Sequence, residues 1–546
     1  MAHNLAPRPR RLQPQLVAAA LAFSLILLAP VSSEAEDVAA AACHDAPAPL
    51  VAGQPTRRWQ LIENEDATNF FFYHDILPGQ AGAAIDRYVD ALADAGVNVL
   101  LCNTNDRRTN YRSAVWQSYW DGFDPAGPDD QPFLAPIPKD QVARYRHLVA
   151  GMLEVDRQGI DYPARMIARS RTRGISPWIT LRMNDVHYND NLDHPFHSPF
   201  WRKPELFRQG TTDYFARALD YAHPEVREHY RALLVETLER YDIDGLELDF
   251  VREPYLFSVG HEAEGRPLLT AWLRDVRRLV DDAARRRGHA IKLGVRVPSC
   301  PQVALGLGLD APTWAHERLV DVVVATPRWA TLQFDMPLAK WRELLGDRVT
   351  LAGGLEVICR PSHNVPPRPA TPAEATGAAV AVLAAGADAL YLFNYFQDGS
   401  PGWSAADYRR TLKAFASPQT LLEQPRRHAI TYRDILAPGE AYHAPLPATG
   451  KEFVFELPLG PPPPAGWQVE AVIETQSAAH VIPPAVRLNG LAGELRSDET
   501  LPNCQQRFTY SLPLAALTGQ NRQTIALHAD TDLTLVAVEI GLKPGD

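Results

Sequence analysis

The segment Asp244-Gly-Leu-Glu-Leu-Asp-Phe-Val-Arg252 alternates polar and apolar residues in the manner of a buried β-strand. Successive side chains on a strand point to opposite faces, so Glu247 and Asp249 share one face. Because unpaired buried carboxylates are costly, two acids on a core-facing strand indicate chemistry, with an ion pair to Arg252 or Arg296 as the structural alternative. We therefore expect this strand to carry part of an active site.

Seven further strands alternate with helical stretches on either side of this segment. Such alternation indicates a parallel sheet with crossover helices. The predicted strands are Asn69–His74, Val97–Asn103, Ile175–Arg182, Gly245–Val251, Ile291–Val297, Val320–Ala325, Thr350–Glu356 and Ala387–Asn394. Eight such units predict an α/β fold, a (β/α)8 TIM barrel over residues 57–420. The alternative is an open doubly wound sheet, for which we would expect a Gly-rich phosphate loop after the first strand, and none is present.

The segments on either side of the barrel differ from it in composition and in the pattern of apolar residues. A basic start, the short apolar run Val17–Ala29 and small residues at the cleavage positions predict a signal peptide over residues 1–35, hence a secreted or periplasmic protein. Residues 36–56 are rich in Ala and Pro and predict a flexible leader. Short alternating segments over residues 425–546 predict a small β-sandwich, which serves either as structural support or as a carbohydrate-binding module.

The composition limits the classes of partner. The chain has 546 residues, of which 46% are hydrophobic and 22% charged, as in an ordinary globular protein. A formal charge of −11 argues against nucleic acid, and after signal removal no segment predicts membrane insertion. Five cysteines are few for a secreted chain; Cys300 and Cys359 follow predicted strands and form a candidate disulfide. The oligomeric state stays open.

Polar residues recur at the carboxyl ends of the predicted strands, where active sites of such barrels form. Aromatic residues in the following loops offer apolar faces on which sugar rings can pack, or else they form loop cores. The residues expected to bind substrate are His74, Asp75, Asn103, Arg182, Asn184, His187, Arg252, Arg296, Asn394, Tyr395, Trp120 and Trp329.

Two acids form the leading catalytic pair. Asp249 ends the fourth strand and Glu356 ends the seventh, so the two carboxylates are expected to face each other across the barrel mouth. Glycoside hydrolysis uses such a pair, one acid to protonate the leaving oxygen and the other to attack carbon or to activate water. Glu247 lies one layer deeper and is the alternative catalytic acid. The structural alternative for Glu356 is a buried partner of an arginine.

Neither a cofactor nor a metal is predicted. No serine nucleophile motif, phosphate loop or dinucleotide fingerprint occurs. His74, together with His187, His194 and His197, raises a metal-dependent hydrolase or lyase as an alternative, although their spacing matches no standard zinc pattern. A further alternative is a non-catalytic barrel that binds carbohydrate.

Three segments resemble those of glycoside hydrolase (β/α)8 barrels, and most closely the bacterial glycosyl-hydrolase-like family ten group. They are Phe70-Phe-Phe-Tyr-His-Asp75, Arg182-Met-Asn-Asp185 and Asp244–Arg252. The resemblance covers roughly residues 57–420 and implies hydrolysis of a carbohydrate substrate.

The sequence departs from two related patterns. Chitinase-like barrels carry a similar fourth strand, but their catalytic Glu would fall at Val251 here. Retaining enzymes of the cellulase-and-xylanase clan place an Asn-Glu pair at the end of the fourth strand, which this chain lacks, whereas Glu356 matches their seventh-strand Glu in position. The resemblance therefore leaves the mechanism open.

Overall fold

The structure is a computed structural model that describes residues 59–66, 68–477, 481–502 and 505–545. The predicted signal peptide (1–35) and leader (36–56) lie outside the described residues. Among the residues described, no helix is both long and apolar enough to span a bilayer.

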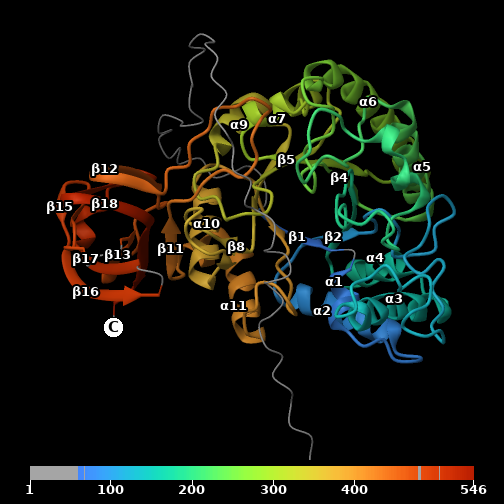
Figure 1. Cartoon of the computed structure of the whole chain (residues 1–546), viewed down its shortest axis with the longest axis horizontal. Helices are drawn as coiled ribbons and strands as arrows, with labels where there is room; N and C mark the ends of the chain where they lie inside the picture. Colours follow the sequence, from blue (N-terminus) through green and yellow to red (C-terminus); the bar gives the residue numbers. More distant parts are fainter. Residues whose placement is uncertain (1–58, 67, 478–480, 503–504, 546) are drawn as a thin grey trace, which may run out of the picture. The chain divides into compact units, whose positions relative to one another are not determined.

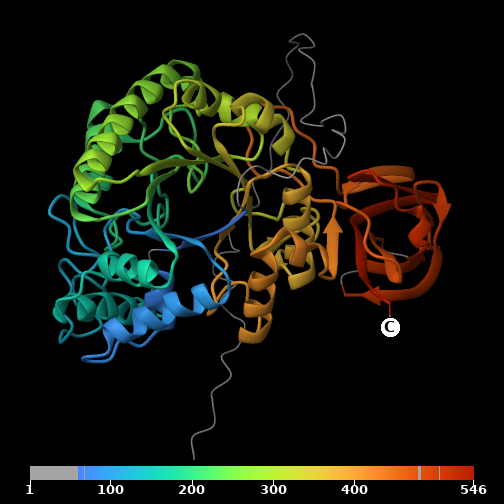
Figure 2. The same cartoon turned by 180° about the vertical axis from the view of Figure 1, so that it is seen from behind.

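Within the described part of the chain, eight parallel strands close into a barrel that helices surround (Figures 1 and 2). Around the barrel the strands follow the order β1-β10-β7-β6-β5-β4-β3-β2. Their bounds are β1 Gln60–Glu65, β2 Val99–Asn103, β3 Ser176–Arg182, β4 Gly245–Asp249, β5 Lys292–Pro298, β6 Val322–Thr326, β7 Thr350–Leu355 and β10 Ala389–Phe393. The (β/α)8 prediction is confirmed, and seven of these strands overlap predicted ones.

The prediction for the first strand was wrong. Residues Asn69–Tyr73 form a short helix, α1, and the first barrel strand is β1, some nine residues earlier. Phe70 and Phe71 are buried against Tyr162, which explains the apolar run. Periodicity cannot distinguish a short buried helix from a strand. As a result, His74 follows a helix and not a barrel strand.

Several of the helices begin with residues that capping rules favour. Several start with Pro in the first turn, and Thr371 and Glu374 form a capping box at the start of α10. The remaining helices are α2 Ala81–Asp94, α3 Val142–Arg157, α4 Tyr162–Thr172, α5 Pro224–Arg240, α6 Glu262–Arg287, α7 Pro301–Gly306, α8 Ala311–His316, α9 Leu338–Leu345, α10 Pro372–Ala384, α11 Ala405–Phe415 and α12 Pro418–Leu422.

The strand register sets the height of each side chain inside the barrel. Low in the barrel, Trp178 fills the space beside Gly245, where an added Cβ would lie 2.2 Å from the indole ring. Higher up, Arg182 pairs with Asp249, and Asp249 pairs with Arg296. Three charged side chains from β3, β4 and β5 therefore enter the interior at one level, near the carboxyl ends of the strands.

The C-terminal part is an antiparallel β-sandwich with a hydrophobic core of its own. The long strand β18 pairs with β11, β12, β13 and β14. The bounds are β11 Arg426–Ala429, β12 Ala448–Pro458, β13 Trp467–Gln476, β14 Ala485–Leu488, β15 Leu491–Ala492, β16 Glu494–Leu501, β17 Gln505–Leu512 and β18 Arg522–Pro544; a separate small ladder joins β8 Ile358–Cys359 to β9 Arg368–Pro369.

The candidate Cys300–Cys359 disulfide does not form. Cys359 and Cys102 are free and buried thiols, whereas Cys300 is disulfide-bonded. Position after a strand is therefore a poor guide to pairing, because it says nothing about whether two sulfur atoms come within bonding distance.

Candidate active site at the carboxyl end of the barrel

Asp249 and Glu356 meet on one arginine. Nη1 of Arg296 donates to Oδ2 of Asp249 at 3.1 Å, and its Nη2 lies 3.7 Å from Oε1 of Glu356. The guanidinium also lies 3.8 Å from the centroid of the Phe393 ring. Acids from β4 and from the end of β7 are thus brought to the same cation from β5.

The two carboxylates have contrasting environments. Oδ1 of Asp249 accepts hydrogen bonds from the backbone N–H groups of Val251 and Arg252, both at 2.9 Å, in addition to its contacts with Arg296. Neither carboxyl oxygen of Glu356 has a hydrogen-bond partner among the described residues. Burial raises the pKa of Glu356 well above its usual value, although the charge of Arg296 opposes the shift. The pair therefore combines a carboxylate held by donors with an acid that favours its protonated form.

Glu247 lies beneath Asp249 in a polar pocket of its own. Its Oε2 accepts from Thr180 Oγ1 at 2.6 Å and from Tyr391 Oη at 3.1 Å, with Asn64 Nδ2 at 3.4 Å. Burial, and then the neighbouring charge of Asp249, raises the pKa of Glu247 to about 7. Its hydrogen bonds fix its position among buried side chains, as expected for a supporting residue.

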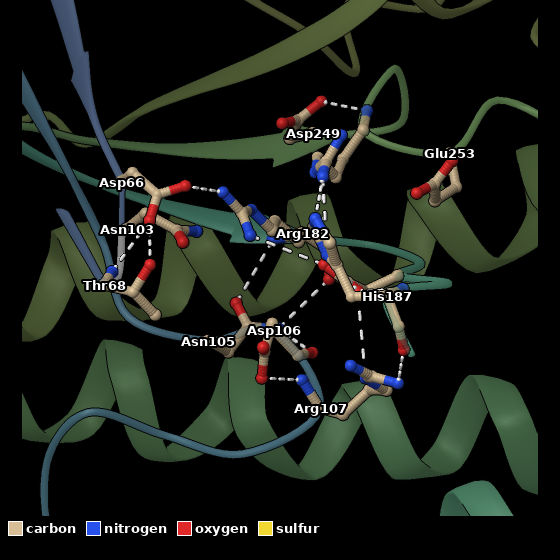
Figure 3. Close-up of polar contacts among 12 residues, drawn as sticks. Asp66, Thr68, Asn103, Asn105, Asp106, Arg107, Arg182, His187, Asp249 and Glu253 are labelled. Carbon is tan, nitrogen blue, oxygen red and sulfur yellow. Dashed lines mark hydrogen bonds and ion pairs between the residues drawn. The ribbon is translucent and has the colours of Figure 1, made fainter. Parts of the chain in front are cut away.

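A second set of ion pairs, centred on Arg182, lies beside the set centred on Arg296. Figure 3 shows Asp66 and Thr68 on one side of this arginine. Nη2 of Arg182 donates to Asp66, and its Nη1 lies 3.4 Å from Oδ2 of Asp185. Burial alone would raise the pKa of Asp66, but the charge of Arg182 and two hydrogen bonds from Thr68 lower it to about 2.

Asp185 orients His187, which in turn contacts Arg252. Oδ1 of Asp185 lies 2.8 Å from Nδ1 of His187, and Nη2 of Arg252 contacts Nε2 of the same ring. A proton on Nδ1 would satisfy both contacts, leaving Nε2 as the acceptor. Burial would raise the pKa of Asp185, but His187, Arg107 and Arg252 together hold it well below its usual range.

Several predicted substrate-binding residues do not join this network. His74 contacts Phe70 and Asp398, and Asp75 is exposed beside His147. These two fail because the strand that was to carry them is a helix. The amide of Asn184 is taken up by both backbone groups of Leu219.

Three more of the predicted substrate-binding residues make contacts outside this network, and a fourth lies at the end of β10. The Tyr395 hydroxyl donates to the backbone oxygen of Glu356, and Asn103 donates to that of Thr180. Trp120 is buried near Arg112, in a pocket between helices of the outer layer. Asn394 follows β10 with a left-handed φ of 63° and is half-buried.

The structure adds site residues beyond those expected to be catalytic or to bind substrate. Asp66 follows the true first strand, and Arg107 comes from the loop after β2 (Figure 3). Nε of Arg107 lies 3.7 Å from Oδ1 of Asp185. Glu253 pairs with Arg328 at 2.7 Å. Glu253 directly follows the quoted β4 segment and was within reach of the same reasoning, whereas Asp66 was hidden by the misplaced first strand.

The described residues contain no group of three or more His, Cys, Asp or Glu side chains able to hold a metal ion. His194 and His197 lie together near Arg107, and His74 is separate from them. Burial, and then the charge of Arg107, lowers the pKa of His194 to about 2 and that of His197 to about 3. Both rings therefore favour the neutral form; His194 stacks on Tyr188, whereas His197 contacts Arg107 and the backbone oxygen of Tyr188.

A (β/α)8 barrel with an ionic network at the carboxyl ends of its strands defines the class of fold. No protein-family model and no curated protein matches the chain. Among solved structures, it is similar to the PgaB glycoside hydrolase domain from Bordetella bronchiseptica, with 10% identity and a TM-score of 0.39 over 66% of this chain and 99% of that one.

Two amylases are similar to a comparable degree. The noncanonic maltogenic α-amylase AmyB from Thermotoga neapolitana is 9% identical, with a TM-score of 0.35 over 88% of this chain and 98% of its own. An α-amylase from Lactobacillus plantarum is 11% identical, with a TM-score of 0.37 over 86% and 98%. These neighbours are glycoside hydrolases, and the function proposed below rests on the side chains of the site and not on these likenesses.

Proposed function

We propose that the protein hydrolyses O-glycosidic bonds of a poly- or oligosaccharide, with Glu356 and Asp249 as the working acids. The observation that carries this proposal is the meeting of the two carboxyl groups on Arg296 in opposite environments. Acid and base roles are assigned where the environments of two titratable groups differ in this way.

Each acid has a defined task in this scheme. Glu356, whose pKa is raised by burial, donates its proton to the leaving glycosidic oxygen. Asp249, held by Arg296 and two backbone N–H groups, supplies the negative charge that attacks the anomeric carbon or deprotonates water. Arg296 keeps both groups in position and balances the charge of Asp249.

The resemblance to the glycosyl-hydrolase-like family ten group supports a carbohydrate substrate. Two of its three motifs, Arg182–Asp185 and Asp244–Arg252, contribute side chains to the ionic network. Export by the predicted signal peptide would expose the enzyme to extracellular or periplasmic glycans.

The test is turnover by carboxamide variants. Wild-type protein is screened on a polysaccharide panel for release of reducing ends, and Asp249→Asn and Glu356→Gln are then compared on the substrate found. Each change should lower turnover by about 10²–10⁴-fold, because it removes a proton-transfer or charged group and keeps the shape. Asp129→Asn, at an exposed carboxylate, is the matched control and should keep full turnover. Full turnover in both site variants would refute the assignment.

A non-catalytic carbohydrate-binding barrel is the second candidate. The observation in its favour is burial, since Glu356 is 0% and Asp249 1% exposed. Catalysis requires side chains above these acids to move when substrate enters, whereas binding at the rim does not. Glycan binding without turnover across the whole panel would favour this candidate over hydrolysis.

A further inference from the structure

The buried arginine side chains described at this end of the barrel are paired with carboxylates or, like Arg108 and Arg208, donate to backbone oxygens. Arg182 pairs with Asp66, and Arg296 with Asp249. The same holds for two arginines from neighbouring loops, namely Arg107 with Asp185 and Arg328 with Glu253. Pairing is the usual way in which a protein offsets the cost of burying a charge.

The guanidinium of Arg252 has neither kind of partner among the described residues. It is 7% exposed, yet no carboxylate oxygen among the described residues lies within 4.0 Å of its guanidinium. Its Nη2 contacts the ring of His187, and its Nε has no hydrogen-bond partner. Because an unpaired buried cation is costly, this guanidinium is suited to receive an anion from outside the chain.

The surroundings of Arg252 include surfaces that a ligand can reach. The Trp329 ring centroid lies 6.0 Å from the guanidinium carbon, and Trp329 is 38% exposed. The side chain of His187 is 36% exposed. A partly exposed indole and a partly exposed imidazole thus lie next to a cation with no carboxylate oxygen within 4.0 Å among the described residues.

We propose that Arg252, His187 and Trp329 form a subsite for a sugar unit that carries an anionic substituent, either the carboxylate of a uronic acid or a sulfate ester. The sugar ring packs on the indole face of Trp329, and the anion binds the guanidinium of Arg252. Arginine presents a planar fork that matches carboxylate and sulfate oxygens. His187, oriented by Asp185, keeps Arg252 in place.

This subsite rests on the proposed carbohydrate substrate but is tested separately from hydrolysis. Binding is measured by calorimetry on the Glu356→Gln protein, so that no probe is consumed. The probes are galacturonate, glucuronate, mannuronate and guluronate trisaccharides, their carboxyl-reduced neutral counterparts, and a sulfated galactan trisaccharide. At least one acidic probe should bind on the order of 30-fold more tightly than its neutral counterpart, as expected for one buried charged contact. Preference for carboxylate or for sulfate identifies the anion.

Two variants assign the preference to these residues. Arg252→Met in the same background should remove the preference for the acidic probe, with little effect on the neutral one. Trp329→Ala should weaken the binding of both probes. Because position 329 is exposed, this variant is expected to fold even if Arg252→Met does not. Arg112→Met, at an exposed arginine paired with Asp156, is the control and should change nothing.

The outcomes separate the subsite from the hydrolase proposal. Equal binding of acidic and neutral probes, or no binding of any acidic probe, overturns the subsite even if wild-type protein hydrolyses neutral glycans. A preference for acidic probes that Arg252→Met leaves unchanged also overturns it. Binding that depends on Arg252, in a protein with no turnover, upholds the subsite and rejects the hydrolase.

Discussion

At the scale of the residue, position within the barrel decides what each acid can do. Glu247 and Asp249 are two residues apart on β4 and face the same interior, as alternation along a strand requires. Glu247 is surrounded by neutral donors, whereas Asp249 meets Arg296 and two backbone N–H groups. The same chemical group is therefore placed in two electrostatic settings.

Glu247→Gln should change how stability depends on pH. The pKa of Glu247 is raised from 4.5 to about 7, so its contribution to stability is fully present below pH 4.5 and is lost as the pH rises through 7. The wild type should lose up to about 3 kcal/mol more than Glu247→Gln between pH 4.5 and pH 8. Urea unfolding at both pH values measures the difference, and parallel losses in the two proteins would contradict it.

Asp66→Asn should act in the opposite direction. Its pKa is lowered from 3.8 to about 2, so Asp66 stabilises the fold above pH 3.8 and this stabilisation is lost as the pH falls towards 2. At pH 7 the variant should be less stable by about 2 kcal/mol, and the gap should close in acid. The measurement is the free energy of unfolding at pH 7 and pH 2. A gap that persists at low pH would show that the loss is one of packing.

The sequence could predict inward-facing acids but not their partners. An ion pair with Arg296 was the structural alternative for the acids of this strand, and the register places Asp249 and Arg296 side by side. Asn184 and Tyr395 were expected to bind substrate, yet they bond to backbone groups of Leu219 and Glu356. Such contacts depend on where the loops fold back, and no local pattern encodes that.

At the scale of the element, glycines make room for large interior side chains. Gly245 of β4 lies against the Trp178 ring of β3, and Gly294 of β5 lies against the same ring. A bulky indole in a barrel interior requires small neighbours, because interiors are packed close to the density of crystals. The two glycines on β4 and β5 thus offset the large indole on β3, and the three strands remain paired in the closed barrel.

Gly245→Ala should destabilise the barrel. The added Cβ would meet the Trp178 ring at 2.2 Å, and overpacking of this kind costs about 1–3 kcal/mol or more. Gly519→Ala, where no atom lies within 4 Å, is the matched control and should unfold at the wild-type midpoint. Thermal unfolding of the two variants provides the comparison, and equal midpoints would show that the indole moves aside.

Strand prediction succeeded where apolar runs were long and failed at the start of the barrel. β1 reads Gln-Leu-Ile-Glu-Asn-Glu, too polar to suggest a buried strand, yet Glu63 and Glu65 are buried. Burial raises the pKa of both carboxyls well above the usual value, which favours their protonated form in the layer between sheet and helices. The Phe-rich segment that was predicted to be the first strand forms the helix α1 instead.

At the scale of the whole molecule, the C-terminal part reaches the barrel mouth. Asp434 follows β11 and accepts hydrogen bonds from the backbone N–H groups of Arg328, Trp329 and Ala330, at 3.0, 2.6 and 2.8 Å. The loop after β6 therefore depends on a residue that lies beyond the last barrel strand.

Asp434→Ala should impair substrate binding more than a surface change does. Three backbone donors would lose their acceptor, and the loss of hydrogen bonds to a charged group should lower the free energy of unfolding by about 1.5–3 kcal/mol. We expect a raised KM as the Trp329 loop loses its position, whereas Asp530→Ala, at an exposed residue of β18, should behave as wild type. An unchanged KM in the Asp434 variant would mean that the loop is held by other contacts.

The anchoring of the Trp329 loop by Asp434 also restricts how this chain can be recombined. A fusion of residues 57–420 to a foreign C-terminal module would contain all the barrel strands. It would lack Asp434, the acceptor that holds the Trp329 loop. The segment needed to hold the Trp329 loop therefore extends beyond the last barrel strand. Chimeras joined between the barrel and the C-terminal part are expected to fold but to bind glycans more weakly.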